Sequence, residues 1–519
     1  MIVTPDEMRA VEDAVFATGV EAEALMTQVG RLLAGHLIRR LWRGGGTVLI
    51  YAGKGNNAGD ALVAAQALAD LARECHVPIE IKLRLALDDP SALGELAKKK
   101  LAVLSPDRFP RLTAVQARTV PSRVGRLCVL DGLLGIGARG ALRDPILSAT
   151  REINDLRHTR GAYVFAIDTP TGLDVATGDT DPDAVIADET LTVGFAKTGL
   201  LADQAANHVG KLHVLALPEF AGAARQAPDA PARGEVITKA SLAGLLAPRI
   251  HESNKGMYGR VGILAGSVGA TGAAVMCSHA CARAGAGLIT LLTHREIYPI
   301  VAAAAAPEVM VKPLDSPLDA LDMNFDVLAL GPGLGQTAAA EVRALIERWP
   351  KPMVVDADGL NSLAEDISPL IRAAGPRLLT PHPGEMQRLL AGDAAARRVA
   401  IETHVSRHDL VRGFTDRYPV TLLLKGARTL IGERGRPLAY NTTGNAGMAT
   451  GGMGDVLTGI CAAFLGQKLS AFDAARLASW LHGRVADRAM LRGHESEQSL
   501  LPTDLFAHFG PVFTELRAG

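Results

Sequence analysis

The chain contains 519 residues, of which 48% are hydrophobic and 21% are charged. This length predicts two or three domains, each with a well-buried core. The 54 lysine and arginine residues nearly balance the 55 aspartate and glutamate residues, which excludes a broad electrostatic field for nucleic acid or an anionic membrane. We therefore expect neither as a partner, and anionic ligands must bind at local sites.

The cysteines are odd in number and scattered, which argues against a disulfide framework and favours a cytoplasmic protein. We expect all five to be packing residues: Cys75, Cys128, Cys277, Cys281 and Cys461. Cys277 and Cys281 share one face of a predicted helix and His279 points away from it, so these three do not predict a zinc site. The first residues lack the basic start and apolar run of a secretion signal.

In the first half of the chain, short apolar runs alternate with alanine-rich helical stretches. Residues 47–51, 127–130 and 164–167 have the composition of buried strands, and each run leads into glycine or aspartate. This alternation predicts βαβ units and a parallel sheet that helices cover on both faces. We assign residues 1–218 to this first α/β domain.

The pattern returns in the second half, after a segment rich in Ala, Pro, Gly and Arg that we interpret as a linker, residues 219–234. Strands are predicted at 261–264, 288–292, 327–330, 353–355 and 421–424, within a second α/β domain at 235–519. Residues 271–293 are long enough to span a membrane, but His279, Arg283 and several glycines interrupt them. We predict a buried helix followed by a strand there, and a homo-oligomer whose interface the sequence does not locate.

Polar residues follow the strands of the first domain. The first strand leads into AGKGNNAGD, residues 52–60, and the next two end at Asp131 and Asp168. Open α/β sheets bind ligands beyond the carboxyl ends of their strands. These two aspartates, with Thr171 and Asn57, could form an oxygen-lined pocket for a hard cation, and the same arrangement could serve acid-base chemistry. The alternative is that these residues only form turns and helix caps.

The second domain contains a glycine-rich turn, TTGNAGMATGGMGD at 442–455, directly before an apolar helix. Unpaired N–H groups at a helix N-terminus stabilise phosphate, and glycines let the backbone approach it. Asp455 could then accept a hydroxyl proton. The alternative is a turn that only needs positive φ angles.

Several motifs occur in the same order as in a known protein family, which is more specific than any single motif. AGKGNNAGD, DGLLGIGARG (131–140), DTPTGLD (168–174) and FAKTGL (195–200) resemble the N-terminal epimerase domain of the bifunctional NAD(P)H-hydrate repair enzymes. The second half is similar to their ADP-dependent dehydratase domain. Its matching segments are NKGMYGRVGILAGS (254–267), TGAA (271–274), GPGLG (331–335), DADGLN (356–361), TPHPGE (380–385), LKGA (424–427) and the turn at 442–455.

The resemblance covers about residues 5 to 515 and implies two doubly wound domains. The first would be a Rossmann-like three-layer αβα domain and the second a ribokinase-like αβα domain. The implied substrates are NADH and NADPH hydrated at C6. The first domain would interconvert their R and S epimers, and the second would dehydrate the S form to NAD(P)H with release of AMP and phosphate from ADP.

In the dehydratase domain, the resemblance implies that Asp455 is the general base and that Gly451, Gly452 and Gly454 hold the phosphoryl group. It also implies a substrate site and a nucleotide site. The substrate residues would be Ala273, Gly333 and His382, and the nucleotide residues Lys425, Gly426, Ala427, Arg428, Thr429, Asn445 and Thr450. The alternative for Lys425 is a strand-end lysine in solvent. We expect Mg²⁺ with the nucleotide, with Glu385 and Asn361 as candidate ligands.

In the epimerase domain, the resemblance implies a potassium ion held by Asn57, Asp131 and Thr171, and proton transfer by Asp168. The implied substrate loops are Asn56, Asn57, Ala58, Gly59 and Asp60, and Gly135, Ile136, Gly137, Ala138, Arg139 and Gly140. Ala58 and Ala61 stand where glycine is common in the family, which would strain the loop if φ were positive. These changes put the strength of the epimerase activity in question.

Two other functions remain open from the sequence. The second domain could be an ATP-dependent kinase of a small alcohol such as a vitamin precursor, because that fold also pairs an anion-binding turn with a base. The first domain could be a binding module without catalytic activity.

Overall fold

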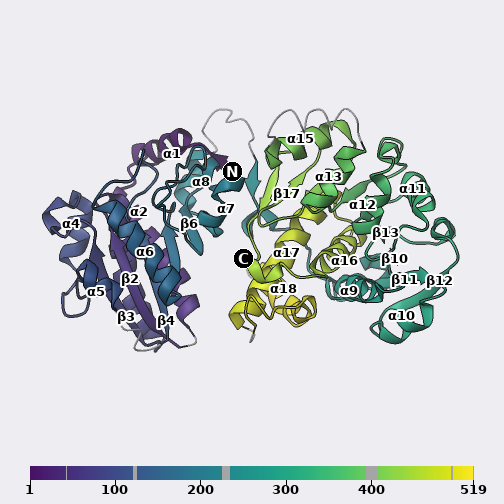
Figure 1. Ribbon diagram of the computed structural model, residues 1–519, viewed down its shortest axis with the longest axis horizontal. Coiled ribbons are helices and arrows are strands. Elements are labelled where there is room, and N and C mark those ends of the chain that lie inside the picture. The colour runs from purple at the N-terminus through teal and green to yellow at the C-terminus, as the bar shows by residue number, and fades with distance from the viewer. Residues whose placement is uncertain are drawn as a thin grey trace. The chain divides into compact units, whose positions relative to one another are not determined.

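The computed structural model describes residues 1–42, 44–120, 125–138, 140–224, 234–392, 406–492 and 495–517. The chain divides into two compact units, Met1–Arg233 and Gly234–Gly519, and Figure 1 shows a sheet covered by helices in each. Helix α8 (Pro218–Ala224) occupies the start of the predicted linker, and residues 225–233 lie outside the described residues.

In the described part of the first unit, six parallel strands form one sheet in the order β3-β2-β4-β5-β6-β8. They are β2 (Gly46–Ala52), β3 (Ile79–Leu85), β4 (Arg126–Gly132), β5 (Tyr163–Ile167), β6 (Glu189–Val193) and β8 (Lys211–Leu215). The three strands predicted in this half are confirmed as β2, β4 and β5. The strand order reverses between β2 and β4, so their carboxyl ends form the crevice where such sheets bind ligands.

Both faces of this sheet are buried, as predicted. Val48 and Ile50 of β2 belong to a core cluster with residues of α2 and α3, whereas Leu49 and Tyr51 belong to a second cluster with residues of α6. Alternate side chains of a strand point to opposite faces, so helices must cover both. The helices are α1 (Pro5–Ala17), α2 (Ala22–Leu41), α3 (Asn56–Glu74), α4 (Glu95–Ala102), α5 (Ala114–Arg118), α6 (Ile146–Arg160) and α7 (Ala206–Val209), and β1 (Ile2–Val3) pairs with β7 (Ala196–Lys197).

In the described part of the second unit, ten strands form a sheet in the order β12-β11-β10-β13-β14-β15-β16-β17-β18-β9. The pairing is parallel from β12 to β16, and β17 pairs antiparallel with β16 and β18. The strands are β9 (Glu235–Val236), β10 (Arg260–Leu264), β11 (Leu288–His294), β12 (Met310–Leu314), β13 (Val327–Leu330), β14 (Met353–Val355), β15 (Arg377–Leu379), β16 (Thr421–Leu424), β17 (Thr429–Gly432) and β18 (Ala439–Asn441). All five predicted strands are confirmed. The order reverses between β10 and β13.

The helices of this unit include three apolar ones that pack together on the sheet: Val261 and Ile263 of β10 share a core cluster with residues of α9, α16 and α17. The helices are α9 (Thr271–Arg283), α10 (Tyr298–Ala304), α11 (Ala339–Arg348), α12 (Ala357–Leu363), α13 (Pro383–Ala391), α15 (Arg407–Arg417), α16 (Met453–Gly466), α17 (Ala471–Arg492) and α18 (Phe509–Arg517). The predicted helix and strand within residues 271–293 are thus α9 and β11. No described helix has the length and hydropathy needed to cross a membrane.

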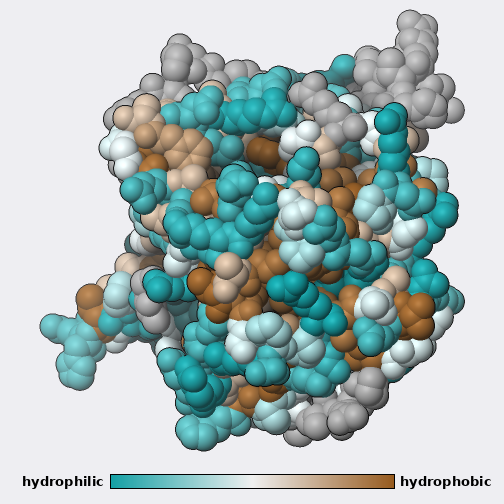
Figure 2. Space-filling model, turned by 90° about the vertical axis from the view of Figure 1, so that its left-hand side faces the viewer, coloured by the Kyte–Doolittle hydropathy of each residue, from teal (hydrophilic) through white to brown (hydrophobic). Residues whose placement is uncertain are grey.

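The cysteines are free thiols, four of them buried and Cys75 partly buried, as expected for packing residues. Burial raises the pKa of Cys128 to about 12, so its thiol stays protonated. His279 stacks on the ring of Phe506 with 4.1 Å between centroids, away from the two cysteines of α9. At the molecular surface, Figure 2 shows a face on which hydrophilic side chains predominate and apolar ones lie in the recesses between them.

Candidate active sites

The glycine-rich turn of the second unit leads into helix α16 as predicted. Gly452 is the N-cap and has a φ of +94°, a left-handed conformation that glycine adopts at no steric cost. The helix begins at Met453, which puts Asp455 in its first turn. The N–H groups of that turn have no partner within the helix and form the positive end of its dipole. The turn therefore provides donors for an anion beside a carboxylate.

Lys425 lies next to the same turn. A Cβ built on Gly454 would come within 3.3 Å of the Lys425 Nζ, which itself lies 2.8 Å from Asp356 Oδ1. Thr458 of α16 donates a hydrogen bond of 2.7 Å to the other oxygen of Asp356, and Glu385 Oε2 lies 3.6 Å from the lysine. The side chain of Lys425 is only 18% exposed, so the alternative of a lysine in solvent is wrong.

Asp455 is tuned by this cluster. Burial raises the pKa of Asp455 to about 6, the negative charges of Asp356 and Glu385 act in the same direction, and Lys425 opposes them. Burial disfavours the charged form of Lys425, but Asp356 and Glu385 more than compensate and raise its pKa. A carboxylate that titrates near 6 can both accept a proton at neutral pH and release it afterwards.

Gly333 and Ala273 lie side by side at the reversal of the strand order. Gly333 follows β13 with a φ of +57°, and a Cβ there would come within 2.8 Å of Ala270 and 3.1 Å of Ala273, at the start of α9. Only glycine allows so close an approach of this loop to the helix. The two predicted substrate residues therefore lie next to each other.

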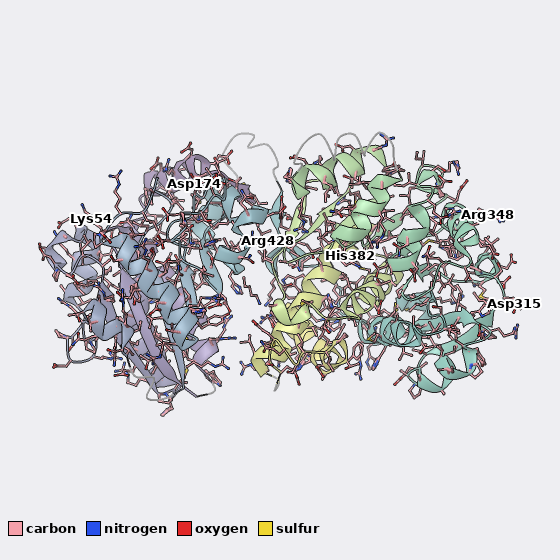
Figure 3. The ribbon with its side chains drawn as sticks, in the orientation of Figure 1. Lys54, Asp174, Asp315, Arg348, His382 and Arg428 are labelled. Carbon is pink, nitrogen blue, oxygen red and sulfur yellow. The ribbon has the colours of Figure 1, made fainter. Side chains whose placement is uncertain are left out.

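His382, labelled in Figure 3, is the N-cap of α13. Its Nδ1 accepts a hydrogen bond from the Gly384 N–H, 3.0 Å away, and Glu385 Oε2 accepts one from the His382 N–H, 2.7 Å away. Half of the side chain remains exposed, so the ring is open to a ligand. Asn361, in contrast, donates to Asp358 and accepts from Arg388, which occupies both ends of its amide.

The remaining predicted nucleotide residues lie in loops around these elements. Thr429 donates to the carbonyl of Gly426, and Arg428, also labelled in Figure 3, is buried whereas Ala427 is exposed. Asn445 caps the short 3-10 turn at Ala446–Met448 and donates to Asp487 of α17. Thr450 and Gly451 lie in the turn that connects this segment with α16.

In the first unit, Asn57, Asp131 and Thr171 meet at the carboxyl ends of β2, β4 and β5. Thr171 donates to Asp131 from its hydroxyl (2.8 Å) and its N–H (2.9 Å). The amide nitrogen of Asn57 donates to the carbonyls of Leu134 and Ile167, which leaves its Oδ1 available. Burial raises the pKa of Asp131 to about 6, although the hydrogen bonds from Thr171 and Leu133 oppose this. Buried oxygens that touch only neutral donors among the described residues fit a monovalent cation.

Asp168 directly follows β5 in a left-handed conformation, with a φ of +63°. Its Oδ1 accepts hydrogen bonds from the hydroxyl of Thr192 (3.1 Å), the N–H of Val193 (2.9 Å) and the ammonium of Lys197 (2.5 Å). Strained backbone of this kind persists where surrounding contacts fix it, often at functional sites. Asp168 is therefore a rigidly held carboxylate with one oxygen free of these bonds.

The loop after β2 continues directly into α3. Asn56, Asn57, Ala58, Gly59 and Asp60 form the first turn of this helix, so Ala58 and Ala61 adopt no positive φ and the suspected loop strain is absent. Burial raises the pKa of Asp60, and the charges of Asp168 and Glu12 raise it further. Figure 3 shows Lys54 and Asp174, from the loops after β2 and β5, toward the same end of the unit.

The second substrate loop of this unit runs from Gly135 to Gly140 and follows β4. Gly135 lies against Asn57, since a Cβ there would come within 3.4 Å of the side-chain amide. Ile136, Gly137 and Ala138 continue the loop, and Gly140 has a φ of +83°. Arg139 lies outside the described residues.

Known proteins match both units. Residues 22–199 match the family model described as YjeF-related protein N-terminus, and residues 261–509 match the one described as NAD(P)H-hydrate dehydratase. A bifunctional NAD(P)H-hydrate repair enzyme of Escherichia coli is 36% identical over 97% of this chain and 92% of its own length. One from Coxiella burnetii is 34% identical over 97% of both chains. The chain belongs to the bifunctional NAD(P)H-hydrate repair enzymes.

Among solved structures, the second unit is similar to an ADP/ATP-dependent NAD(P)H-hydrate dehydratase of Bacillus subtilis, co-crystallised with ATP and Mg²⁺. The identity is 26% over 55% of this chain and 99% of that one, with a TM-score of 0.45. As a repair enzyme, the chain combines an epimerase and a dehydratase unit. The curated relatives that match along the whole chain are named repair enzymes, so the alternative of a kinase with an attached binding module is set aside.

Two charged residues that lie at the proposed sites of this repair enzyme were not identified from the sequence. Asp356 follows β14 and binds Lys425 from 69 residues away, and Lys197 binds Asp168 from 29 residues away. Both residues lie within motifs that match the family, Asp356 in DADGLN and Lys197 in FAKTGL. Their place in these motifs was the sequence feature that could have identified them as site residues. Their burial was not predictable, because charged residues are rarely buried unless paired, and the pairing is tertiary.

Proposed function

We propose that the second unit dehydrates hydrated NADH or NADPH with ADP as the phosphoryl donor and Asp455 as the general base. One arrangement carries this proposal: a carboxylate with a pKa of about 6 in the first turn of α16, beside Lys425 and unpaired backbone donors. The terminal phosphoryl group of ADP binds at the N–H groups around Gly451, Gly452 and Gly454. Lys425 offsets part of its charge.

The reaction then proceeds in two steps. Asp455 accepts the proton of the C6 hydroxyl as this oxygen bonds to the terminal phosphorus of ADP, and the bond from that phosphorus to its bridging oxygen breaks to release AMP. The C6–O bond next breaks as phosphate leaves, and loss of a proton from C5 restores the ring double bond. Hydroxide is a poor leaving group and phosphate a good one, which explains the need for a donor.

Mg²⁺ would accompany the nucleotide, where it neutralises charge on the phosphates. Glu385 fits as its ligand better than Asn361, because the carboxylate of Glu385 lies at the cluster beside Lys425. The amide of Asn361 is already bound at both ends by Asp358 and Arg388.

For the first unit, we propose that Asp168 transfers the proton during epimerisation while Lys197 holds the carboxylate in place. Asp168 lies close enough to Glu12 and Asp60 for its charge to act on both acidic groups, whose pKa values are raised mainly by burial and further by Asp168. Asn57, Asp131 and Thr171 would hold K⁺, which compensates the buried charge of Asp131 and orders the substrate loop at Gly135.

Replacing Asp455 with Asn tests the dehydratase proposal. We expect the ADP-dependent return of reduced-ring absorbance to fall by about 10²–10⁴-fold, because the base is lost. ADP binding, measured by calorimetry, should remain, because the backbone donors are intact. Asp409→Asn is the matched control: Asp409 occupies the same position in the first turn of α15, where it accepts a hydrogen bond from the hydroxyl of the N-cap Ser406. Retained turnover in Asp455→Asn would refute the role.

A further inference from the structure

The amino-terminal edge of the first sheet, opposite the proposed epimerase site, carries a second polar cluster. His36 comes from α2, Glu189 is the first residue of β6, and His213 lies in the neighbouring strand β8. One ring nitrogen or carboxylate oxygen of each lies within 4.8 Å of those of the other two. Tyr163 and Arg40 border the cluster.

The geometry points to a metal site that has no part in the proposed reactions: we propose that His36, Glu189 and His213 bind a divalent transition-metal ion such as Zn²⁺. Two imidazoles and one carboxylate form a ligand set that zinc uses with a water molecule in the fourth position. Tetrahedral ligand atoms about 2.1 Å from zinc lie about 3.4 Å apart, so small side-chain rotations are enough to close the site.

His213 provides an independent indication. Its Nε2 lies 3.1 Å from Glu189 Oε2, in an ion-pair contact that lacks hydrogen-bond geometry. Buried imidazole nitrogens normally make a well-aligned hydrogen bond, so a contact that is close but misaligned fits two ligands of one shared cation. A metal ion beside the two groups would use both atoms.

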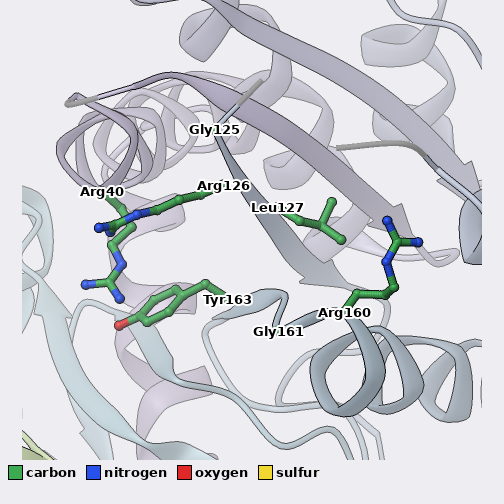
Figure 4. A pocket seen from close by; sticks show the side chains of 7 residues that line it. All are labelled: Arg40, Gly125, Arg126, Leu127, Arg160, Gly161 and Tyr163. Atoms are coloured by element: carbon green, nitrogen blue, oxygen red, sulfur yellow. The ribbon is translucent and has the colours of Figure 1, made fainter. Parts of the chain in front are cut away.

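Glu189 is prepared for ligation on its other oxygen. The hydroxyl of Tyr163 donates a hydrogen bond of 2.7 Å to Glu189 Oε1, and the guanidinium of Arg40 lies 3.9 Å from the centre of the Tyr163 ring. Figure 4 shows the Arg40 side chain directed at that ring, in a cavity of about 330 Å³ that Arg126 and Leu127 also line. Such contacts orient a ligating carboxylate.

The ligand atoms select the kind of ion. Arg40 and Lys211 add positive charge near Glu189, which weakens the binding of any divalent cation held by charge attraction alone. Mg²⁺ binds mainly through oxygen ligands, of which the cluster offers one carboxylate, whereas imidazole nitrogen binds Zn²⁺ strongly.

Metal titration of the full chain tests the proposal. The protein is treated with a chelator, which is then removed. ZnCl₂ is titrated into the protein in a calorimeter, in the presence of excess MgCl₂ and KCl. We expect one tight equivalent per chain and, with Co²⁺, the visible absorption of a tetrahedral site. His213→Gln and His36→Gln should each weaken binding by more than about 100-fold and abolish the absorption, whereas Tyr163→Phe should weaken it by about 10-fold and keep it.

The control is His208→Gln, which removes a nearby imidazole that contacts the carbonyl of Val185. It should bind zinc like the unchanged protein. Thermal unfolding in the presence of chelator checks that all variants are equally stable without metal. If one histidine variant does not fold, Glu189→Gln replaces it as a ligand variant. The proposal is overturned if the unchanged protein binds no zinc, or if the His36 and His213 variants bind it as the control does.

Discussion

At the scale of single residues, the two carboxylates proposed for proton transfer are held in different ways. Asp168 is fixed by three donors on one oxygen and by a strained backbone. Asp455 lies in a helical first turn, and its pKa is set mainly by burial and by the charges of Asp356 and Lys425. The first arrangement favours a precise position, and the second favours a proton affinity close to neutral pH.

The pH dependence of dehydration follows from Asp455. Burial raises the pKa of this carboxyl to about 6, and only the ionised form can act as a base. We expect kcat/KM for dehydration to rise with pH through about 6 and to level off above it, falling about tenfold per pH unit on the acid side. Stopped assays of NAD(P)H formation at saturating ADP measure this profile. If kcat/KM instead stays constant as the pH falls from neutral to about 3.9, the pKa of an ordinary aspartate, Asp455 is not the titrating base.

Lys197 provides a second test at this scale. Its buried ammonium binds Asp168 Oδ1, Thr192 and the carbonyl of Val193. Lys197→Met keeps the length of the side chain but removes the charge beside Asp168, so we expect kcat for epimerisation to fall by at least about 10-fold. Dehydration of the S epimer should not change.

The control for this variant is Lys82→Met in β3, where the lysine forms an ion pair with Glu80. Epimerisation can be followed by chromatographic separation of the two hydrates. Equal epimerisation in both variants would show that Lys197 has no part in holding Asp168.

At the scale of elements, the entry into α16 determines whether the phosphate donors converge. Gly452 has a φ of +94°, and a Cβ there would meet the side chain of Met276 at 2.7 Å. We expect Gly452→Ala to lower the free energy of unfolding by about 1–2 kcal/mol and to weaken ADP binding, because the first turn must shift. Thermal unfolding and calorimetry measure the two effects.

Gly413→Ala is the control for this substitution. Gly413 lies inside α15, has no positive φ, and its added Cβ would touch nothing within 4 Å. Alanine there should leave ADP binding unchanged and raise stability by up to about 1 kcal/mol. If both variants bind ADP equally well, the conformation of Gly452 does not position the donors.

The strands that could be predicted from the sequence contain a run of buried, mostly apolar residues. β2, β4 and β16 contain such runs, with turn residues after them. β3 (IEIKLRL), β8 (KLHVL) and β12 (MVKPL) were not predicted, because edge strands carry charged residues that break an apolar run. Their partners and register come from tertiary contacts, which no local pattern contains.

The same limit applies to the sites. Asn57, Asp131 and Thr171 could be predicted to meet, because each follows or ends a strand of one parallel sheet. The ion pair of Lys425 with Asp356 could not, because a lysine at a strand end is usually exposed. The helix cap formed by His382 was also missed, since histidine is not a common capping residue.

At the scale of the whole molecule, each unit contains its own sheet, core and proposed site, which predicts that the two activities are separable. The residues proposed for epimerisation all lie in Met1–Arg233, and those proposed for dehydration in Gly234–Gly519. The expected homo-oligomer and cytoplasmic location stay predictions. Separate sites predict that a change in one unit leaves the other reaction intact.

Mixing two variants, each of which lacks one of the two activities, tests this separation. With ADP and both hydrate epimers, Asp168→Asn should restore only the absorbance that comes from the S form, because the R form is no longer converted. Asp455→Asn should restore almost none, although it still interconverts the epimers. A mixture of the two proteins should restore all of it, since the epimers diffuse between molecules. The contrary outcome is a mixture that restores no more absorbance than Asp168→Asn alone. In that case, either the two reactions require both sites in one chain or Asp455→Asn has lost its epimerase activity. Chromatography of the two epimers after incubation with Asp455→Asn alone distinguishes these explanations.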